Sequence, residues 1–332
     1  MTMLSDAAVR RLRVAATWPV FATDRYTVLR EIGRGGMGTV YLAVDATLRR
    51  EVAVKVPHAA VSAELERRLE HEARVLARLE HPGIVPVHDC GRLADGRLYN
   101  VMKHVKGRTL RDHLAGVPDI NDRLAIFERL CDPVAFAHAQ GFVHRDLKPD
   151  NVMLGAFGEV MVMDWGVAKT LGSGADAEAG TPAFAGAAQT EVGTVVGTRG
   201  FMAPEQATGG ASTVDARADI YSLGAILAML LTGDASPHDG AAAWRTGSQV
   251  PVPRPLRAIV VRALAADPID RYPTVKALAD DVAKYRSGMA VDAHRETLAD
   301  RAWRYGRTYR TPILLVLAYI VMRAIVAVVG GH

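Results

Sequence analysis

Residues 144–151 read His144-Arg145-Asp146-Leu147-Lys148-Pro149-Asp150-Asn151, a short polar run between two apolar stretches. Phe142-Val143 leads into the run, and Val152-Met153-Leu154 follows it. Charged groups of both signs are costly to place between buried segments unless a site uses them. The run therefore indicates a functional loop, around which the remaining motifs can be ordered.

The composition is that of a globular protein, with 332 residues, 49% of them hydrophobic and 23% charged. This length suffices for a sizeable core and predicts one domain with short flanks. The net charge of +4 is small, so it does not indicate nucleic acid binding. Only Cys90 and Cys131 are present, which excludes a disulfide framework and a four-cysteine metal site and fits a reducing compartment. Residues 1–24 form a leader without the apolar core of a secretory signal.

Residues 25–44 alternate apolar and polar side chains on both sides of a glycine cluster, which predicts a β-hairpin. The cluster, residues 33–40, reads Gly-Arg-Gly-Gly-Met-Gly-Thr-Val. Glycines let the backbone approach phosphates, and the free amides can point at them. A Rossmann turn has the same spacing of glycines, but a helix should follow it. Residues 39–44 predict a second strand instead, which favours a phosphate-covering hairpin.

Further motifs follow in chain order. Residues 51–56 read Glu-Val-Ala-Val-Lys-Val, a predicted strand at 159–163 ends in Asp164-Trp165-Gly166, and residues 203–205 read Ala-Pro-Glu. With the glycine cluster and the run at 144–151, these match the protein kinase motifs in order. Residues 25–285 thus resemble the eukaryotic-like Ser/Thr protein kinases of bacteria. The resemblance implies an α+β, two-lobed protein kinase fold, with a small antiparallel β-sheet N-lobe containing one helix (about 25–105) and a larger α-helical C-lobe (about 106–286).

The resemblance also implies catalytic roles. Asp146 would accept the proton of the substrate hydroxyl, and Lys148 would stabilise charge on the transferring phosphoryl group. Asn151 and Asp164 would hold Mg²⁺, with Mn²⁺ as an alternative. Thr198 would lie near Asp146 and help a Ser/Thr substrate to fit.

ATP would bind between the lobes. Lys55 would pair with Glu72 on a helix within 62–80, with Glu70 as the alternative partner. The gatekeeper would be Met102, followed by a hinge at 103–105 in which Lys103 replaces the usual acidic residue. The residues expected to bind the nucleotide are Ile32, Gly33, Gly35, Gly36, Gly38, Val40, Ala53, Lys55, Glu72, Met102, Val105 and Met153.

The activation segment, from Asp164 to Glu205, is rich in Gly, Ala, Ser and Thr between 169 and 200, which predicts a loop. Thr190 and Thr194 are candidate phosphorylation sites, and Arg145 offers a guanidinium to such a phosphate. Phosphorylation in trans within a homodimer is expected. By the same resemblance, Asp219 would hold the backbone of the catalytic loop, and Arg271 would pair with Glu205.

Helical patterns are predicted at 121–140, 219–231, 256–265 and 275–285. After a basic juxtamembrane segment at 287–311, residues 313–329 are apolar except for Arg323, which predicts a transmembrane helix within 312–331. About a dozen apolar residues outweigh the cost of about +3 kcal/mol for one central Arg. The arginines before this segment place that side in the cytoplasm, with the anchor in the inner membrane. The alternative is a C-terminal helix packed on the kinase or on a partner chain.

The sequence therefore predicts an ATP- and Mg²⁺-dependent protein Ser/Thr kinase of bacterial signalling that autophosphorylates its activation segment. The alternative is a catalytically weak, kinase-shaped membrane scaffold, which Trp165, Lys103 and a C-lobe shortened at 234–255 favour. A small-molecule phosphotransferase is disfavoured, because Ala203-Pro204-Glu205 and a phosphorylatable loop serve protein substrates.

Overall fold

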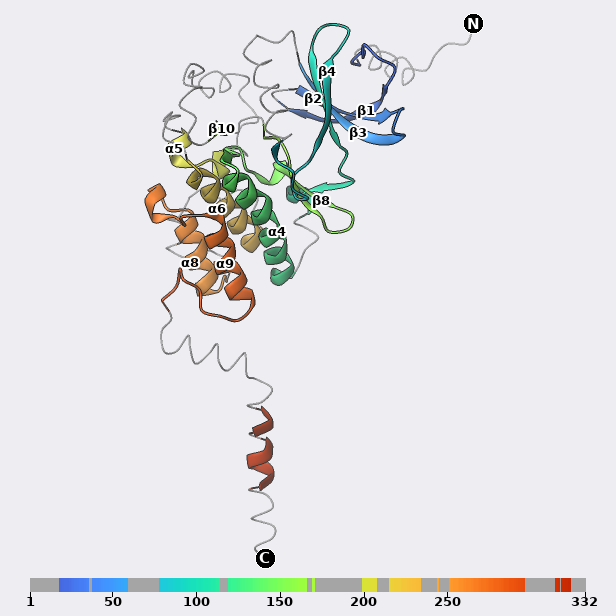
Figure 1. Ribbon diagram of the computed structural model, residues 1–332. Helices are drawn as coiled ribbons and strands as arrows, with labels where there is room; N and C mark the ends of the chain where they lie inside the picture. Colours follow the sequence, from blue (N-terminus) through green and yellow to red (C-terminus); the bar gives the residue numbers. More distant parts are fainter. Residues whose placement is uncertain are drawn as a thin grey trace, which may run out of the picture.

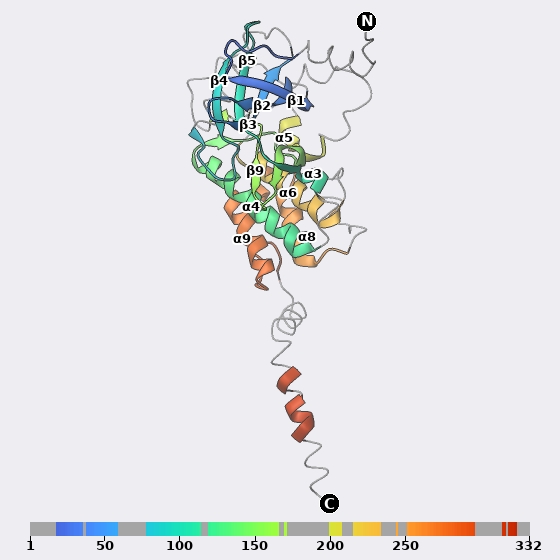
Figure 2. The same cartoon turned by 90° about the vertical axis from the view of Figure 1, so that its right-hand side faces the viewer.

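The computed structural model describes residues 18–35, 38–58, 78–113, 119–165, 169–170, 199–207, 215–233, 244, 251–295, 314–316 and 318–323. Figures 1 and 2 show a sheet-rich N-lobe above a helical C-lobe. The predicted two-lobed fold is confirmed. The predicted leader lies outside the described residues up to position 17.

The N-lobe is built on a five-stranded antiparallel sheet of order β1-β2-β3-β5-β4. Its strands are β1 (Tyr26–Gly35), β2 (Gly38–Asp45), β3 (Arg50–Pro57), β4 (Val87–Arg92) and β5 (Leu98–Lys103). Strands β1 and β2 pair up to Gly35 and Gly38, so the glycine cluster joins two strands as predicted. Val52, Val54 and Val101 have no exposed surface, which places the centre of this lobe's core on β3 and β5.

Four helices organise the C-lobe: α4 (Ile120–Ala139), α6 (Arg217–Thr232), α8 (Arg254–Ala263) and α9 (Val275–Arg286). The four helices predicted for the C-lobe are present, with ends shifted by at most two residues. The helix predicted within 62–80 lies outside the described residues up to position 77. Helix α6 is buried from Ala218 to Leu231, because its sequence is apolar on all sides. Helix α4 packs against α6, α9 and strand β9 (Val160–Val162), so α4 and α6 form the centre of the lobe.

Short strands hold the catalytic loop at the interface between the lobes. Strands β6 (Gly107–Thr109), β8 (Val152–Gly155) and β9 form one sheet, and β7 (Phe142–Val143) pairs with β10 (Lys169–Thr170). The polar run at 144–151 connects β7 to β8 and ends in a 3₁₀ turn, η2 (Pro149–Asn151). The run is thus fixed at both ends by buried strands.

The lobes are joined by backbone contacts as well as by the hinge. Val85 donates to the carbonyl of Val162 at 3.0 Å, and Val162 donates to Gly83 at 2.8 Å. Gly83 lies against the ring of Pro133, where a Cβ on Gly83 would meet Pro133 Cγ at 2.9 Å. Pro133 is buried inside α4, so it forms part of the contact between the lobes.

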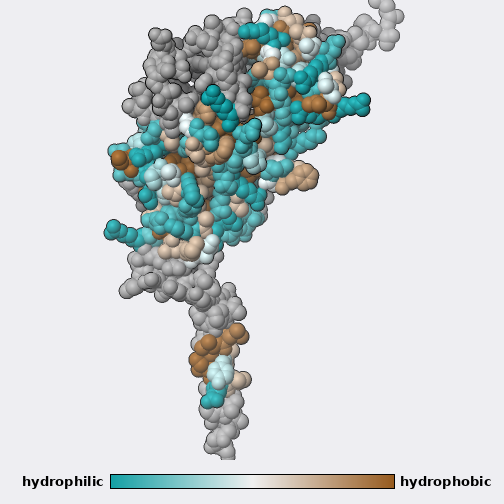
Figure 3. Space-filling view, viewed as in Figure 1, coloured by the Kyte–Doolittle hydropathy of each residue, from teal (hydrophilic) through white to brown (hydrophobic). Residues whose placement is uncertain are grey.

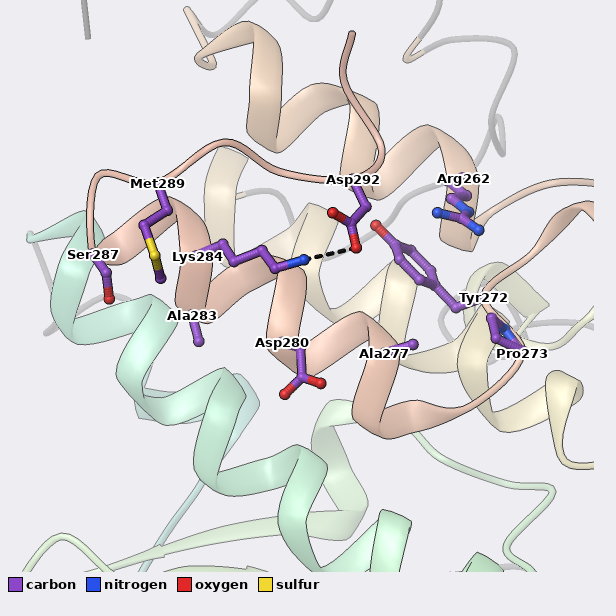
Figure 4. A pocket seen from close by; sticks show the side chains of 10 residues that line it. All are labelled: Arg262, Tyr272, Pro273, Ala277, Asp280, Ala283, Lys284, Ser287, Met289 and Asp292. Atoms are coloured by element: carbon purple, nitrogen blue, oxygen red, sulfur yellow. Dashed lines mark hydrogen bonds and ion pairs between the residues drawn. The ribbon is translucent and has the colours of Figure 1, made fainter. Parts of the chain in front are cut away.

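Ordered contacts extend past helix α9. The fully buried carboxylate of Asp281 accepts hydrogen bonds from the amides of Asp292 and Ala293, at 2.6 and 3.0 Å, and from the hydroxyl of Tyr272 at 2.7 Å. Lys284 pairs with Asp292 at 2.7 Å, as Figure 4 shows. Asp281 therefore fastens the chain after α9 onto the C-lobe.

The predicted transmembrane segment is described only at 314–316 and 318–323, which are helical; Ile313, position 317 and 324–329 lie outside the described residues. Large apolar side chains there are 54–67% exposed, from Leu314 to Met322. The stretch lies apart from the C-lobe in Figures 1 and 2, and Figure 3 shows brown apolar surface on it. Within the described part of the chain, no helix has the length and apolarity that a membrane span requires.

Candidate active site

Three polar side chains meet in the loop between β7 and β8. Lys148 Nζ lies 2.8 Å from Oδ2 of Asp146. Asn151 Nδ2 donates to the backbone carbonyl of Asp146 at 2.8 Å and to its Oδ2 at 3.2 Å. The Asp146 carboxylate is therefore oriented from two sides, while its side chain keeps 27% of its surface exposed.

Asp219, at the start of α6, holds the backbone that precedes Asp146. It is fully buried and accepts from the amides of His144 and Arg145 and from Nε2 of His138, each at 2.8 Å. Burial opposes ionisation of Asp219, but the hydrogen bond and charge of His138, followed by His144, outweigh it and hold the pKa of Asp219 below its ordinary value. The predicted contact of Asp219 with the catalytic-loop backbone is confirmed.

Two residues of the site have left-handed backbone. Arg145 has a φ of 69° and Asp164 a φ of 65°. A non-glycine residue in this region costs about 1–3 kcal/mol and persists only where surrounding contacts over-determine it. For Arg145, the bonds to Asp219 supply such contacts. Strain of this kind concentrates at functional sites, so its presence in both polar motifs marks one site.

Lys55, on β3, forms an ion pair with Asp164, which follows β9. The pair joins the two lobes, and Lys55 is only 7% exposed. Burial disfavours the ionised form of Asp164, but the charge and hydrogen bond of Lys55 outweigh it, aided by His144 and Lys148. The pKa of Asp164 accordingly lies below its ordinary value.

Trp165 packs behind the site with no exposed surface. Its indole lies 4.6 Å from the imidazole of His144, measured between ring centroids. Nε2 of His144 lies 3.0 Å from the carbonyl of Met163. Among the described residues, Trp165 Nε1 has no acceptor. The large ring thus keeps its place in the core despite the cost of a buried, unpaired N–H.

The apolar residues predicted to bind the nucleotide come from adjoining elements. Val40 pairs with Lys55 across β2 and β3, and Ala53 pairs with Met102 across β3 and β5. Met153 lies on β8. Ile32, Val40, Met102, Val105 and Met153 are all half-buried, whereas neighbouring core residues are fully buried.

The glycines differ in what surrounds them. A Cβ on Gly38 would lie 2.4 Å from the carbonyl oxygen of Val56, so only glycine fits there. Gly33 and Gly35 have room, with at most an ordinary contact to Val40. Among the described residues, therefore, no packing contact requires glycine at positions 33 and 35.

At the hinge, basic side chains replace an acidic one. Lys103 is exposed, and its amide donates to Pro86 at 3.1 Å. Glu51 on β3 pairs with Lys106 at 2.9 Å, and its carboxylate lies 3.4 Å from Nδ1 of His104. Glu51 thereby balances part of the positive charge next to the hinge.

Other residues named from the sequence lie outside the described residues. These are Gly36, Glu72 and its alternative Glu70, Thr190, Thr194 and Thr198. Their predicted roles stay predictions.

The predicted pair of Glu205 and Arg271 is confirmed. Arg271 is 2% exposed and donates to the two carboxylate oxygens of Glu205 at 2.7 and 2.8 Å. It also donates to the carbonyls of Ala265 and Arg217, at 2.8 and 2.9 Å. The end of the activation segment is thus tied to the turn before α9.

Sequence reasoning missed Arg111 in helix α3 (Leu110–His113). Arg111 donates to both carboxylate oxygens of Asp150, at 2.7 and 2.8 Å, and lowers the pKa of that carboxyl. Its guanidinium also lies 5.9 Å from the ring centroid of Phe201. No local pattern marks Arg111, because its partners are distant in sequence.

The oxygen ligands that Asp164 and Asn151 offer suit a hard divalent cation. Asp164 offers a carboxylate, and Asn151 offers its amide oxygen while its Nδ2 is used internally. The described residues contain no group of three or more His, Cys, Asp and Glu able to hold a metal ion. Mg²⁺ needs no such cage, since one or two protein oxygens, waters and substrate phosphates complete its coordination.

A separate pocket of about 490 Å³ lies on the C-lobe, lined by residues of α8 and α9 and of the chain on either side of α9. The residues brought together around Asp146 and Asp164 line no part of it. The chemistry-bearing groups therefore lie elsewhere, between the lobes.

Comparison with known proteins gives a family for this arrangement. The protein kinase domain family matches residues 26–271. The serine/threonine-protein kinase PknB of Mycolicibacterium smegmatis is 38% identical over 297 residues, covering 83% of this chain and 45% of the relative. PknB of Mycobacterium tuberculosis is 35% identical over 86% of this chain and 48% of the relative. PknD of Chlamydia pneumoniae is 34% identical over 80% and 31%, so the chain spans less than half the length of these relatives.

Proposed function

The chain belongs to the protein kinase family, among the bacterial serine/threonine-protein kinases, and we propose that it transfers the γ-phosphoryl group of ATP to serine or threonine hydroxyls of proteins. The observation that carries the proposal is the Lys55–Asp164 ion pair. It brings a lysine of the N-lobe sheet to a carboxylate that lies in the same site as the Asp146 loop.

Asp146 would orient the attacking hydroxyl and accept its proton. The contacts of Lys148 and Asn151 with Asp146 support this role, because they fix the carboxylate while leaving part of it exposed. Lys148 would stabilise negative charge that spreads onto the transferring phosphoryl group. Each of these groups is preorganised by the loop, so little rearrangement is needed during transfer.

Asn151 and Asp164 would hold Mg²⁺ through their oxygens, and Mn²⁺ offers the same chemistry to these ligands. When bound, the ion would neutralise charge on the ATP phosphates. Lys55 would hold the phosphates from the N-lobe side, and its ion pair keeps Asp164 ionised.

ATP would bind under the β1–β2 hairpin, with its adenine against the hinge. The half-buried positions of Ile32, Val40, Met102, Val105 and Met153 support an apolar cleft. Open space at Gly33 and Gly35 supports a close approach of phosphates to the backbone. Glu72 would pair with Lys55, with Glu70 as the alternative partner.

Autophosphorylation at Thr190 or Thr194, in trans within a homodimer, would activate the enzyme. A phosphate near the catalytic loop could pair with Arg145 and order the activation segment. Thr198 would assist the fit of the acceptor hydroxyl. Intact mass measurement with and without ATP, followed by Thr190→Ala and Thr194→Ala, assigns the modified residue.

The kinase domain would occupy residues 25–286 and act in signalling from the cytoplasm, anchored by a helix within 312–331 after the segment 287–311. The exposed apolar side chains between Leu314 and Met322 support this proposal, since exposing a run of apolar side chains to water is unfavourable. Fractionation of cells that express the chain tests it: an anchored protein resists extraction by carbonate and dissolves in detergent.

The decisive experiment incubates the purified protein with labelled ATP, magnesium chloride and a general protein acceptor. Wild type should label Ser and Thr residues, and Asp146→Asn should not. Binding of ATP without transfer by wild type would instead support the scaffold reading.

A further inference from the structure

The side chain of Gln206 connects the end of the activation segment to the catalytic loop. Gln206 lies in helix α5 (Pro204–Ala207) and is only 8% exposed. Its Nε2 donates to the carbonyl of Arg145 at 2.8 Å, and its Oε1 accepts from the amide of Ala203 at 3.2 Å. Both ends of the amide are used, so its orientation is fixed by one donor and one acceptor.

The carbonyl that Gln206 reaches belongs to the peptide unit directly before Asp146. The nitrogen of the same unit donates to Nδ1 of His144 at 3.3 Å. This peptide is therefore held on both sides. Because Arg145 has a φ of 69°, the unit would relax to a commoner conformation if its restraints were removed.

The restraints on this backbone have two different origins. Asp219 holds the amides of His144 and Arg145 from α6, a helix buried in the C-lobe core. Gln206 holds the carbonyl of Arg145 from the activation segment's end. Only the second restraint depends on where that segment lies.

We propose that Gln206 is a positioning residue for phosphoryl transfer, which sets the direction of Asp146 when the end of the activation segment is in place. The proposal rests on the assignment of Asp146 as proton acceptor. Gln206 bonds to backbone and not to the reacting carboxylate, so it acts through Asp146. The position of the segment's end, residues 203–207, is thereby transmitted to Asp146 through one side-chain amide.

Ser222 on α6 offers a matched control. Its hydroxyl is 2% exposed and donates to the carbonyl of Phe201 at 2.8 Å. It fastens the same part of the chain to α6, and its other recorded bond is to Ala218 within the helix. Ser222→Ala thus removes a buried hydrogen bond of similar kind without touching the peptide before Asp146.

The first test compares Gln206→Met with Ser222→Ala. We expect Gln206→Met to lower kcat about tenfold or more, which corresponds to ~1.4 kcal/mol, with KM for ATP unchanged. Ser222→Ala should lower the unfolding temperature to a similar degree and leave kcat within about twofold. Equal kcat losses in both variants, or none in Gln206→Met, would overturn the proposal.

The second test uses Gln206→Glu, whose side chain keeps an oxygen that can accept from the amide of Ala203. This variant tests the proposal even if Gln206→Met does not fold stably. As a carboxylate it faces the carbonyl of Arg145 without a hydrogen to donate, but its protonated form can donate again. Burial raises the pKa of such a carboxyl toward the assay range. The kcat ratio of Gln206→Glu to wild type should therefore rise from pH 8 to pH 5.5, while the Gln206→Met ratio stays flat.

A flat ratio for Gln206→Glu would contradict the positioning role. Wild type that transfers no phosphoryl group would refute the proposed function instead, so the two failures are distinguishable. Binding of ATP, measured by calorimetry on each variant, should match wild type, because Gln206 holds the proton acceptor and not the nucleotide.

Discussion

Lys55 of strand β3 forms an ion pair with Asp164 across the two lobes, although 109 residues separate them in the sequence. The side chain of Lys55 is 8% exposed and that of Asp164 is 41% exposed. The ammonium is therefore enclosed, whereas part of the Asp164 side chain stays exposed even though burial of the carboxylate disfavours its ionised form. Such a carboxylate can take a further ligand without losing its lysine.

Replacement of Lys55 by Met should abolish most transfer while the fold persists. Loss of one preorganised cationic donor costs about 10²- to 10³-fold in kcat. Solvent reaches Asp164, so the free carboxylate should not unfold the protein. Phosphoryl transfer and thermal unfolding measure the two effects. Lys276→Met is the control, because this side chain on α9 is 78% exposed, and it should match wild type in both measurements. Full activity of Lys55→Met would show that Lys55 takes no part in transfer.

The polar motifs of this site could be predicted because each is local. The loop at 144–151, the β1–β2 hairpin and the strand that leads to Asp164 are short runs whose order and spacing are visible in sequence. The confirmed bond of Asp219 to the loop backbone followed from resemblance. Helix ends shifted by up to two residues where caps decide. Asp119 accepts from the amide of Asn121 at 2.6 Å and caps α4, which begins one residue before the predicted start.

Long-range contacts outside the motifs of the resemblance could not be predicted. Arg111 meets Asp150 39 residues away, and Gln206 meets Arg145 61 residues away. Neither side chain belongs to a periodic pattern, and only the folded backbone brings it to its partner. The attachment of Asp292 to Asp281 is similar, since the chain turns back after α9 without a sequence signal.

Alanine at Gly35 and at Gly38 should have different effects. Gly38→Ala places a Cβ 2.4 Å from the Val56 carbonyl, so the β2–β3 contact must shift and the unfolding temperature should fall. Gly35→Ala meets nothing within 4 Å and should leave stability unchanged. If phosphates approach this backbone, Gly35→Ala should still raise KM for ATP several-fold. Thermal unfolding without nucleotide measures the effect on stability, and steady-state kinetics measures the effect on KM for ATP. An equal fall in the unfolding temperature of both variants would contradict the packing argument.

The Glu205–Arg271 pair should matter for stability more than surface pairs do. Arg271→Met removes the guanidinium that donates to Glu205 and to the carbonyls of Ala265 and Arg217. We therefore expect a loss of about 3–5 kcal/mol in the free energy of unfolding. Glu205→Gln keeps hydrogen-bonding capacity and should cost about 1–2 kcal/mol. Urea unfolding followed by circular dichroism measures both. Lys276→Met again serves as the control, because its exposed ion pair with Asp280 should contribute less than about 1 kcal/mol to the free energy of unfolding. A loss in Lys276→Met as large as in Arg271→Met would show that burial does not explain the cost of losing Arg271.

Asp219 should give the protein a stability that disappears in acid. Its pKa is lowered below the ordinary value of 3.8 because His138 and His144 outweigh burial. A carboxyl with a lowered pKa stabilises the fold above its unfolded-state pKa, and this stabilisation is lost as the pH falls through the lower, folded-state value. Asp219→Asn should therefore cost about 3–5 kcal/mol at pH 7. The difference from wild type should be constant down to about pH 5 and shrink below about pH 4. Urea titrations at successive pH values measure it, with Asp280→Asn at an exposed carboxylate as the control. A difference that stays constant to pH 3 would mean that the charge of Asp219 does not hold the catalytic loop.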